Sequence, residues 1–244
     1  MTVVQIKPSV NVGRFIRKFG YNADVDAFTG ADEDIIAAGG DQYWPAAAVA
    51  AANIDIASSD AADTSAGTGA RTIVIEGLDA DGVEQSETII LSGTTDVHPV
   101  NDYLRIHRAY VETVGTGGVN AGAITIDDGT GTFAVIPAGK GQTQQATYTV
   151  PTGYTAWGMH VHVSVEHGVA AFARGEFQTR KGAGYSWRTR LTFISEDTNE
   201  AQHQLNPGAD KFPAGTDIRL RILTASADNL FISGEFVLYL EPTP

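Results

Sequence analysis

Two histidines have the type and spacing that could bind a metal ion. His160 and His162 are two residues apart, so both side chains point to the same side of a β-strand. Together with a third ligand from elsewhere in the chain they could hold zinc. Such a pair is more often part of the polar face of a half-buried strand. We therefore expect no metal at this pair.

An aspartate pair raises the question of calcium. Asp79 and Asp81 match the third and fifth positions of a calcium-binding loop laid on residues 77–88. The first and twelfth positions are Gly77 and Thr88, so the first ligand and the bidentate carboxylate are missing. We interpret the segment as a tight turn, and a looser calcium site between loops stays open as an alternative.

The glycine-rich segments fail the tests for nucleotide binding. In GTGGVNAG the position of the third glycine is Asn120, and in IPAGKGQT Lys140 is followed by Gly141 instead of Ser or Thr. The chain has no cysteine, which excludes disulfides and thiol nucleophiles, and no Gly-x-Ser-x-Gly motif. We expect a protein that is not an enzyme and needs no cofactor.

The distribution of charge points to a protein partner. A formal net charge of −13 disfavours nucleic acid, and no apolar stretch has the length of a membrane span. Residues 1–21 carry four bases and no acid, whereas residues 22–100 carry 15 acids and one base. Aromatic and aliphatic residues lie between the bases of the first segment. We expect an arm that binds an acidic surface.

A predicted hairpin at residues 174–190 offers a second basic surface with aromatic residues. Arginine and tryptophan are enriched at interaction hot spots, although an ordinary charged outer face explains the same pattern. The residues that we expect to bind a partner are Arg14, Phe15, Ile16, Arg17, Lys18 and Phe19 in the arm, and Arg180, Trp187, Arg188 and Arg190 in the hairpin.

The elements that must position these residues are β-strands. From residue 71 onward the hydrophobic pattern has a period of two, with turn signals every 8–14 residues. This pattern predicts an all-β fold, an antiparallel sandwich or jelly roll of about eleven strands with an extended N-terminal arm. We expect strands within 71–77, 85–93, 101–114, 120–128, 131–139, 144–151, 155–168, 169–181, 185–195, 216–225 and 230–241.

The domain boundaries follow from the same pattern. Residues 1–57 are expected to form the arm, with little regular structure, and residues 58–244 the β-sandwich body, which could consist of two packed subdomains dividing near 140–150. On the strand at 155–168 we expect one face of Met159, Val161, Val163 and Val165 and an opposite face of His160, His162, Ser164 and Glu166.

Residues 33–127 resemble a recurrent type of tailed-bacteriophage virion structural protein. The similarity lies in EDIIAAGGDQYWP, in SSDAADTSAGTGARTIVIEGLDADGVEQSETIILSGTTDV and in NDYLRIHRAYVETVGTGGVNAGAITI, whereas residues 1–30 depart from it. The resemblance implies a non-enzymatic component of the particle, and the basic arm favours a capsid decoration or cement protein that stabilises the lattice.

The resemblance also implies the partners. We expect the chain to bind the major capsid protein or another virion protein, and to be assembled into the virion in the host cytoplasm. Uncovered strand edges predict a homo-oligomer, with a trimer as the first expectation. The alternatives are a neck, tail or fibre-attachment protein, or a receptor- or carbohydrate-binding β domain.

Overall fold

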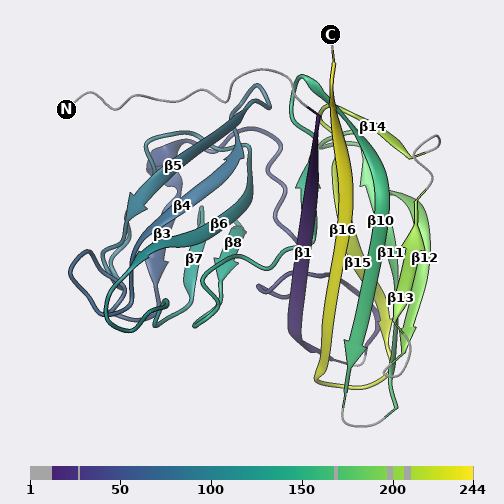
Figure 1. Ribbon diagram of the computed structural model, residues 1–244, viewed down its shortest axis with the longest axis horizontal. Coiled ribbons are helices and arrows are strands. Elements are labelled where there is room, and N and C mark those ends of the chain that lie inside the picture. The colour runs from purple at the N-terminus through teal and green to yellow at the C-terminus, as the bar shows by residue number, and fades with distance from the viewer. Residues whose placement is uncertain (1–12, 27, 168–169, 197–199, 206–209, 244) are drawn as a thin grey trace.

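The chain folds into two all-β lobes that lie side by side in the computed structural model (Figure 1). The structure describes residues 13–26, 28–167, 170–196, 200–205 and 210–243. In this part of the chain there are sixteen strands, all paired antiparallel, and one short 3-10 turn. The predicted all-β, antiparallel class is confirmed, but the strands form four sheets.

The N-terminal lobe contains two three-stranded sheets, ordered β5-β4-β6 and β3-β7-β8. One core of buried residues from both sheets, including Ile73, Tyr103, Ile126 and Phe133, holds them together. The elements are η1 (Ala51–Asn53), β3 (Asp55–Ser58), β4 (Ala70–Leu78), β5 (Glu84–Ile90), β6 (Arg105–Val114), β7 (Ile124–Asp127) and β8 (Thr132–Ile136).

The C-terminal lobe contains two five-stranded sheets, which we name the β1 sheet and the β15 sheet. The β1 sheet has the order β1-β16-β10-β13, with β14 also paired to β10. Its strands are β1 (Arg14–Val25), β10 (Tyr154–Glu166), β13 (Ala201–Gln204), β14 (Lys211–Pro213) and β16 (Leu230–Pro242).

The β15 sheet has the order β12-β11-β15-β2, with β9 paired to β15. Buried side chains of both sheets, among them Val163, Phe177, Leu220 and Phe236, form one shared core. The strands of this sheet are β2 (Phe28–Asp34), β9 (Thr147–Thr149), β11 (Phe172–Arg180), β12 (Arg188–Glu196) and β15 (Asp217–Ala225).

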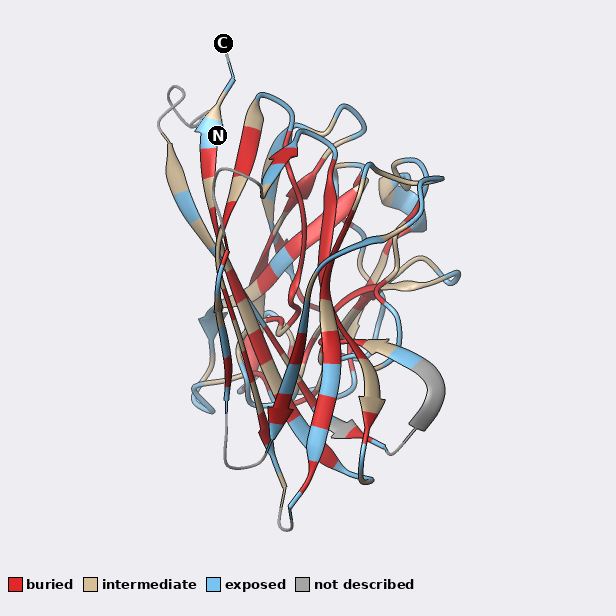
Figure 2. Cartoon of the chain, turned by 90° about the vertical axis from the view of Figure 1, so that its right-hand side faces the viewer, coloured by how far each residue is buried: buried red, intermediate tan, exposed pale blue. Residues whose placement is uncertain are grey.

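Alternation along the strands places one face of each against a core, as the banding of buried and exposed residues in Figure 2 shows. On β10, Val161, Val163 and Val165 are buried as expected. Met159 is only half-buried, because the pairing with β16 shifts its register between Gly158 and His160. A bulge of this kind changes the face to which the preceding side chains point.

The prediction of an N-terminal arm with little regular structure is wrong for the described part of that segment. β1 pairs with β16 over its whole length, and β2 pairs with β15, so both strands belong to the C-terminal lobe. Gly20 allows β1 to come close to its neighbours, since a Cβ there would lie 2.0 Å from the Ile35 carbonyl oxygen. Residues 1–12 lie outside the described residues.

The order of the chain makes the N-terminal lobe an insertion. The C-terminal core includes Val25 and Ile35, is interrupted by the residues of the N-terminal core, and resumes at Ala146. The predicted boundary between residues 57 and 58 therefore does not separate an arm from a body. Instead, residues of about 50–140 fold on their own core between β2 and β9.

Candidate partner-binding face

The alternation of β1 divides the six predicted arm residues between two faces. Ile16 packs against the C-terminal core and Lys18 is buried, so the even-numbered residues point inward. Phe15 is 67% exposed and Phe19 is 36% exposed, and Arg17 lies between them on the outward face. The structure thus brings Phe15, Arg17 and Phe19 together.

Cross-strand pairing extends this outward face over the whole β1 sheet. Phe15 lies opposite Tyr239 of β16, which in turn lies opposite Trp157 of β10. Lys211 of β14 follows Trp157, and its ammonium nitrogen lies 4.8 Å from the centre of the indole. Four strands therefore contribute one continuous row of three aromatic side chains that ends in a lysine.

The next two rows of the same face are mainly polar, with one apolar side chain in each. We call the whole surface the docking face; besides the aromatic row it contains Arg17, Val237, His160 and Gln204 in the second row and Phe19, Glu235, His162 and Gln202 in the third row. All of these side chains are exposed or half-buried. The docking face is therefore mainly apolar at the end with the aromatic row, and it carries hydrogen-bonding groups at the other end.

The charges of the docking face are largely neutralised within the face. Arg17 Nε donates to Glu235 at 2.7 Å, and His162 Nε2 lies 3.1 Å from a Glu200 carboxylate oxygen. His160 shares a hydrogen bond with Gln204 across the strands. The face therefore offers ordered aromatic and polar groups, and little net charge.

The inward residues of β1 connect the two lobes. Arg14 forms an ion pair with Glu84 of β5 and donates to the hydroxyl of Tyr154. Lys18 donates to the carbonyl oxygen of His107 on β6. Burial lowers the pKa of Lys18 to about 7, and the neighbouring Arg108 guanidinium adds to the effect. Arg14 and Lys18 therefore connect β1 to the N-terminal lobe, and their side chains are not free to bind a partner.

The four predicted residues of the hairpin also separate. Arg188 and Arg190 are exposed, and Arg190 donates to the hydroxyl of Thr179. Trp187 lies between two guanidinium groups, with that of Arg219 4.0 Å and that of Arg180 4.5 Å from its ring centre. Trp44 lies between Trp187, at 5.5 Å between ring centres, and the guanidinium of Arg105 on β6, at 5.3 Å, so Arg180 and Trp187 lie at the joint between the lobes.

A buried carboxylate forms the centre of this joint. Asp217 of β15 is fully buried and accepts hydrogen bonds from Thr149 Oγ1 at 2.7 Å, from Arg180 Nε at 2.9 Å and from Arg105 at 3.3 Å. Arg105 comes from β6 of the N-terminal lobe. A second group, Arg219 and Arg221 around the buried Asp34, continues along the same face of β15.

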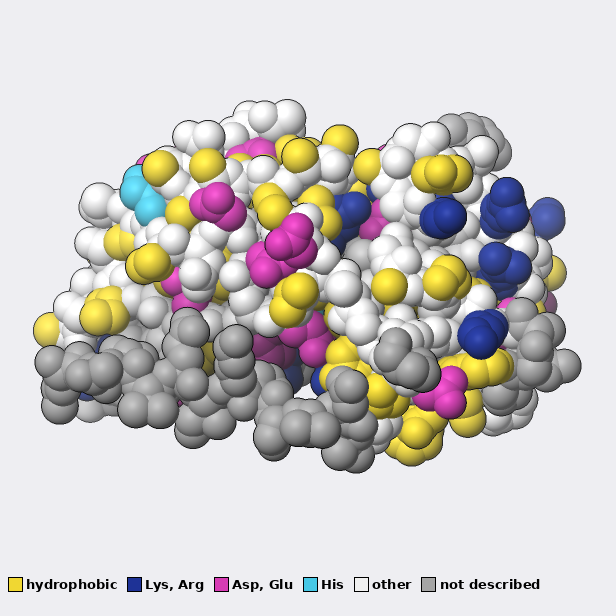
Figure 3. Space-filling model, turned by 90° about the horizontal axis from the view of Figure 1, so that it is seen from above, with side chains coloured by type: hydrophobic (Ala, Val, Ile, Leu, Met, Phe, Trp, Pro, Cys, Tyr) yellow, Lys and Arg dark blue, Asp and Glu magenta, His cyan; other side chains and the backbone are white. Residues whose placement is uncertain are grey.

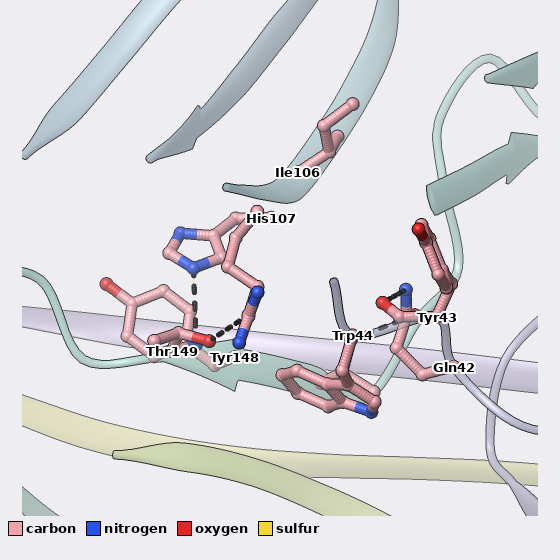
Figure 4. Close-up of a pocket in the computed structure, with 9 residues that line it drawn as sticks. Gln42, Tyr43, Trp44, Ile106, His107, Tyr148 and Thr149 are labelled. Carbon is pink, nitrogen blue, oxygen red and sulfur yellow. Dashed lines mark hydrogen bonds between the residues drawn. The ribbon is translucent and has the colours of Figure 1, made fainter. Parts of the chain in front are cut away.

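A small cleft with a volume of about 10 Å³, room for about one water molecule, opens beside the joint (Figure 4). Gln42 donates to two backbone carbonyls, and His107 Nε2 accepts from the backbone N–H of Thr149 at 3.2 Å. Burial lowers the pKa of His107 well below its usual range, with Lys18 and Arg105 adding to the effect, so the imidazole stays neutral. Gln42 and His107 are thus engaged at the joint, whereas Trp44 Nε1 and the Tyr148 hydroxyl, which also line the cleft, have no hydrogen-bond partner among the described residues.

The motifs with metal-binding spacing serve backbone geometry or cross-strand pairing. One carboxylate oxygen of Asp79 accepts from the backbone N–H groups of Asp81 and Val83, which closes the predicted turn between β4 and β5. The rings of His160 and His162 stack with centres 6.5 Å apart. Over the described ranges, no three His, Asp or Glu side chains are grouped to hold a metal ion.

The sequence did not predict the larger part of the docking face, which comes from strands other than β1. Tyr239 and Trp157 are 82 residues apart and both lie far from Phe15 in the sequence. The period of two in both segments predicts that each side chain faces away from a core. Their pairing partners could not be predicted, because no short hairpin connects β1 with β16.

Comparisons with known proteins identify no family. No family model matches the chain, and no curated protein matches it. Structures of infectious bursal disease virus are weak neighbours: the Gt strain at 10% identity, covering 100% of this chain and 82% of that chain, has a TM-score of 0.13. The virus-derived T=1 particle, at 11% identity and 95% and 79% coverage, has a TM-score of 0.12. Similarity at this level carries no argument about fold or function.

The described part of the chain also contains no helix that is long and apolar enough to span a membrane.

Proposed function

We propose that the chain is a non-enzymatic structural component of a phage particle, of the capsid decoration or cement type. In this proposal the docking face binds the major capsid protein or another virion protein, and the joined lobes project from the lattice. The observation that carries the proposal is the aromatic row of Phe15, Tyr239 and Trp157 on the outward side of the five-stranded β1 sheet. The resemblance of residues 33–127 to virion structural proteins supplies the class of partner.

The energetics favour apolar anchoring over ionic attraction. Phe15 exposes 67% of its surface. Covering one such aromatic side chain contributes about 1.5–3 kcal/mol. Arg17 is already paired with Glu235, so a new ion pair at the surface would add only about 0–1 kcal/mol. The aromatic row should therefore dominate affinity, and the polar rows should set the orientation of the partner.

A carbohydrate-binding role is the rival reading, and the ring geometry weighs against it. A flat sugar ring stacks on aromatic faces that are open and parallel to the sheet. The rings of Phe15 and Tyr239 are inclined by 51° to each other, and Lys211 covers the face of Trp157. Such tilted rings fit between the side chains of a protein partner better than against a sugar.

The test is binding to particles that lack this chain. Purified protein is mixed with such particles and the bound fraction is measured by co-sedimentation. Phe15→Ala combined with Tyr239→Ala should weaken binding by about tenfold or more, because about 1.4 kcal/mol corresponds to a factor of ten. Both side chains lie on the outside of the sheet, so the melting temperature should change little.

The matched control is Phe172→Ala. Phe172 is an aromatic residue of the β15 sheet with 42% exposure, and it lies outside the docking face. This variant should bind like the unmodified protein. Full occupancy by the double variant, or an equal loss with Phe172→Ala, would contradict the proposal.

A further inference from the structure

The charges of the two lobes are separated on the surface. Viewed from above, acidic side chains lie on the half formed by the N-terminal lobe, and basic side chains gather at the far end of the C-terminal lobe (Figure 3). Residues 50–140 contain 13 acids and four bases. Within the described ranges, only Asp55 and Glu84 of these acids have an ion-pair partner.

The basic end is a compact surface of four exposed side chains. The pairing of Thr179 with Arg188 places Arg188 beside the turn that carries Lys181. The Arg190 guanidinium lies 5.6 Å from the ring centre of Phe212, next to Lys211. In the part of the chain that the structure describes, none of these four bases lies within 4.0 Å of a carboxylate. Their charge is therefore free for a partner.

The N-terminal lobe offers a surface that matches the basic end. Asp81 is exposed at the turn between β4 and β5, beside Val83, which is 47% exposed. Asp102 lies near the same turn, because Gln85 of β5 donates to its backbone carbonyl at 2.6 Å. Val100, close by, is 86% exposed. Acidic and apolar groups thus alternate there, as basic groups and the exposed Tyr185 do at the basic end.

We propose that the basic end of one copy binds the acidic turn of a second copy of this chain. The contact joins two different patches, so it is heterologous, and heterologous contacts generate closed rings when the rotation allows closure. A trimer is the smallest ring in which each copy places its basic end on one neighbour and its acidic turn on the other. The proposal stands on the charge distribution of the two lobes and, apart from Lys211, on residues outside the docking face.

The oligomeric state of charge-reversal variants tests this contact. The molar mass is measured by light scattering over a range of concentrations, in dilute buffer and in about 1 M salt, where the screening length falls to about 3 Å. The unmodified protein should associate in dilute buffer and dissociate in salt. Lys181→Glu with Arg188→Glu, and separately Asp81→Lys with Asp102→Lys, should each weaken association by about tenfold or more.

Mixing the two variants gives the decisive result. Each patch of one variant then faces an opposite charge on the other, so an equimolar mixture should regain association, as open alternating chains, because a three-membered ring cannot alternate. Arg174→Glu is the control for Arg188→Glu, because Arg174 is exposed at the opposite end of β11 and carries the same charge. It should leave the mass unchanged, and thermal melting identifies any variant that does not fold.

Three outcomes would overturn the proposal. The first is a monomer mass for the unmodified protein in dilute buffer at every concentration. The second is a mixture that stays monomeric although both variants are folded. The third is loss of particle binding in the basic-end variant while the unmodified protein stays monomeric, which would assign the basic end to an acidic surface of another virion protein. Particle binding by the Phe15 and Tyr239 variant is a separate readout, so failure of either proposal is recognised on its own.

Discussion

At the scale of single residues, Asp63 explains why the glycine-rich segment after β3 is ordered. Its carboxylate is fully buried and accepts from Ser58 Oγ at 2.6 Å and from the backbone N–H groups of Ala70, Ala121 and Gly122. Burial opposes ionisation, but these hydrogen bonds outweigh it and hold the pKa of Asp63 below its usual range. The Asp63 carboxylate is therefore structural: it connects the segment after β3 to the loop that contains Ala121 and Gly122.

We predict that Asp63→Asn destabilises the protein by about 2–3 kcal/mol at neutral pH, because an amide group cannot accept four hydrogen bonds in this arrangement. The folded pKa is lowered, so the stabilising effect of Asp63 is complete above the unfolded pKa and is lost as the pH falls through the folded pKa. Urea unfolding of both proteins at pH 7 and at strongly acidic pH measures this. If the free energies of unfolding of the two proteins differ by the same amount in acid as at pH 7, the prediction is wrong.

At the scale of elements, β1 is a structural strand as well as a part of the docking face. Removing residues 14–25 would uncover the edge of β16 and take Ile16 and Val25 out of the C-terminal core. We predict that this deletion abolishes cooperative unfolding of the C-terminal lobe, as followed by circular dichroism. A truncated protein that melts like the full chain would contradict the assignment of β1.

Lys18 should make stability depend on pH. Its pKa is about 7 in the folded protein and 10.5 ordinarily, so between these values the unfolded state binds more protons and stability rises with pH. The expected slope is up to about 1.4 kcal/mol per pH unit. Lys18→Met should remove this rise between pH 7 and about pH 9.5 and should be more stable at pH 7. An unchanged slope in the variant would show that Lys18 is charged or exposed.

Local patterns predicted the elements whose partners are near in sequence. The pairs β4 with β5 and β7 with β8 follow hairpin signals, and both were expected. β1 was missed because its partner, β16, begins more than 200 residues later, and β13 and β14 are too short to show a period. β15 carries Arg219 and Arg221 on a face that looks solvent-exposed in sequence, but the lobe joint buries both. The same holds for the docking face: the sequence predicted only its β1 residues, because the strands that pair with β1 and with each other lie far apart in the sequence.

At the scale of the whole molecule, the buried charges of the joint should couple the two lobes. Asp217 is the only carboxylate within 4.0 Å of Arg105 and Arg180 among the described residues. Asp217→Asn would keep the shape but leave two buried guanidinium groups without compensation, which costs about 3–5 kcal/mol. Calorimetry should show that this variant unfolds at a lower temperature and in two separate steps, one for each core.

The control for the joint is Glu235→Gln. It also removes the carboxylate partner of an arginine, but Arg17 is exposed, so the loss should be about 0–1 kcal/mol. If both substitutions lower stability by the same small amount, the joint contributes no more than a surface ion pair and the lobes are held by other contacts.

A cryo-electron microscopy map of particles that carry the chain would show whether the outward side of the β1 sheet binds a neighbouring virion protein, as we propose. We expect density of another protein packed against Phe15, Tyr239 and Trp157, with the N-terminal lobe farther from that contact. A map in which this face is open to solvent, while another surface of the chain touches the particle, would contradict the proposal.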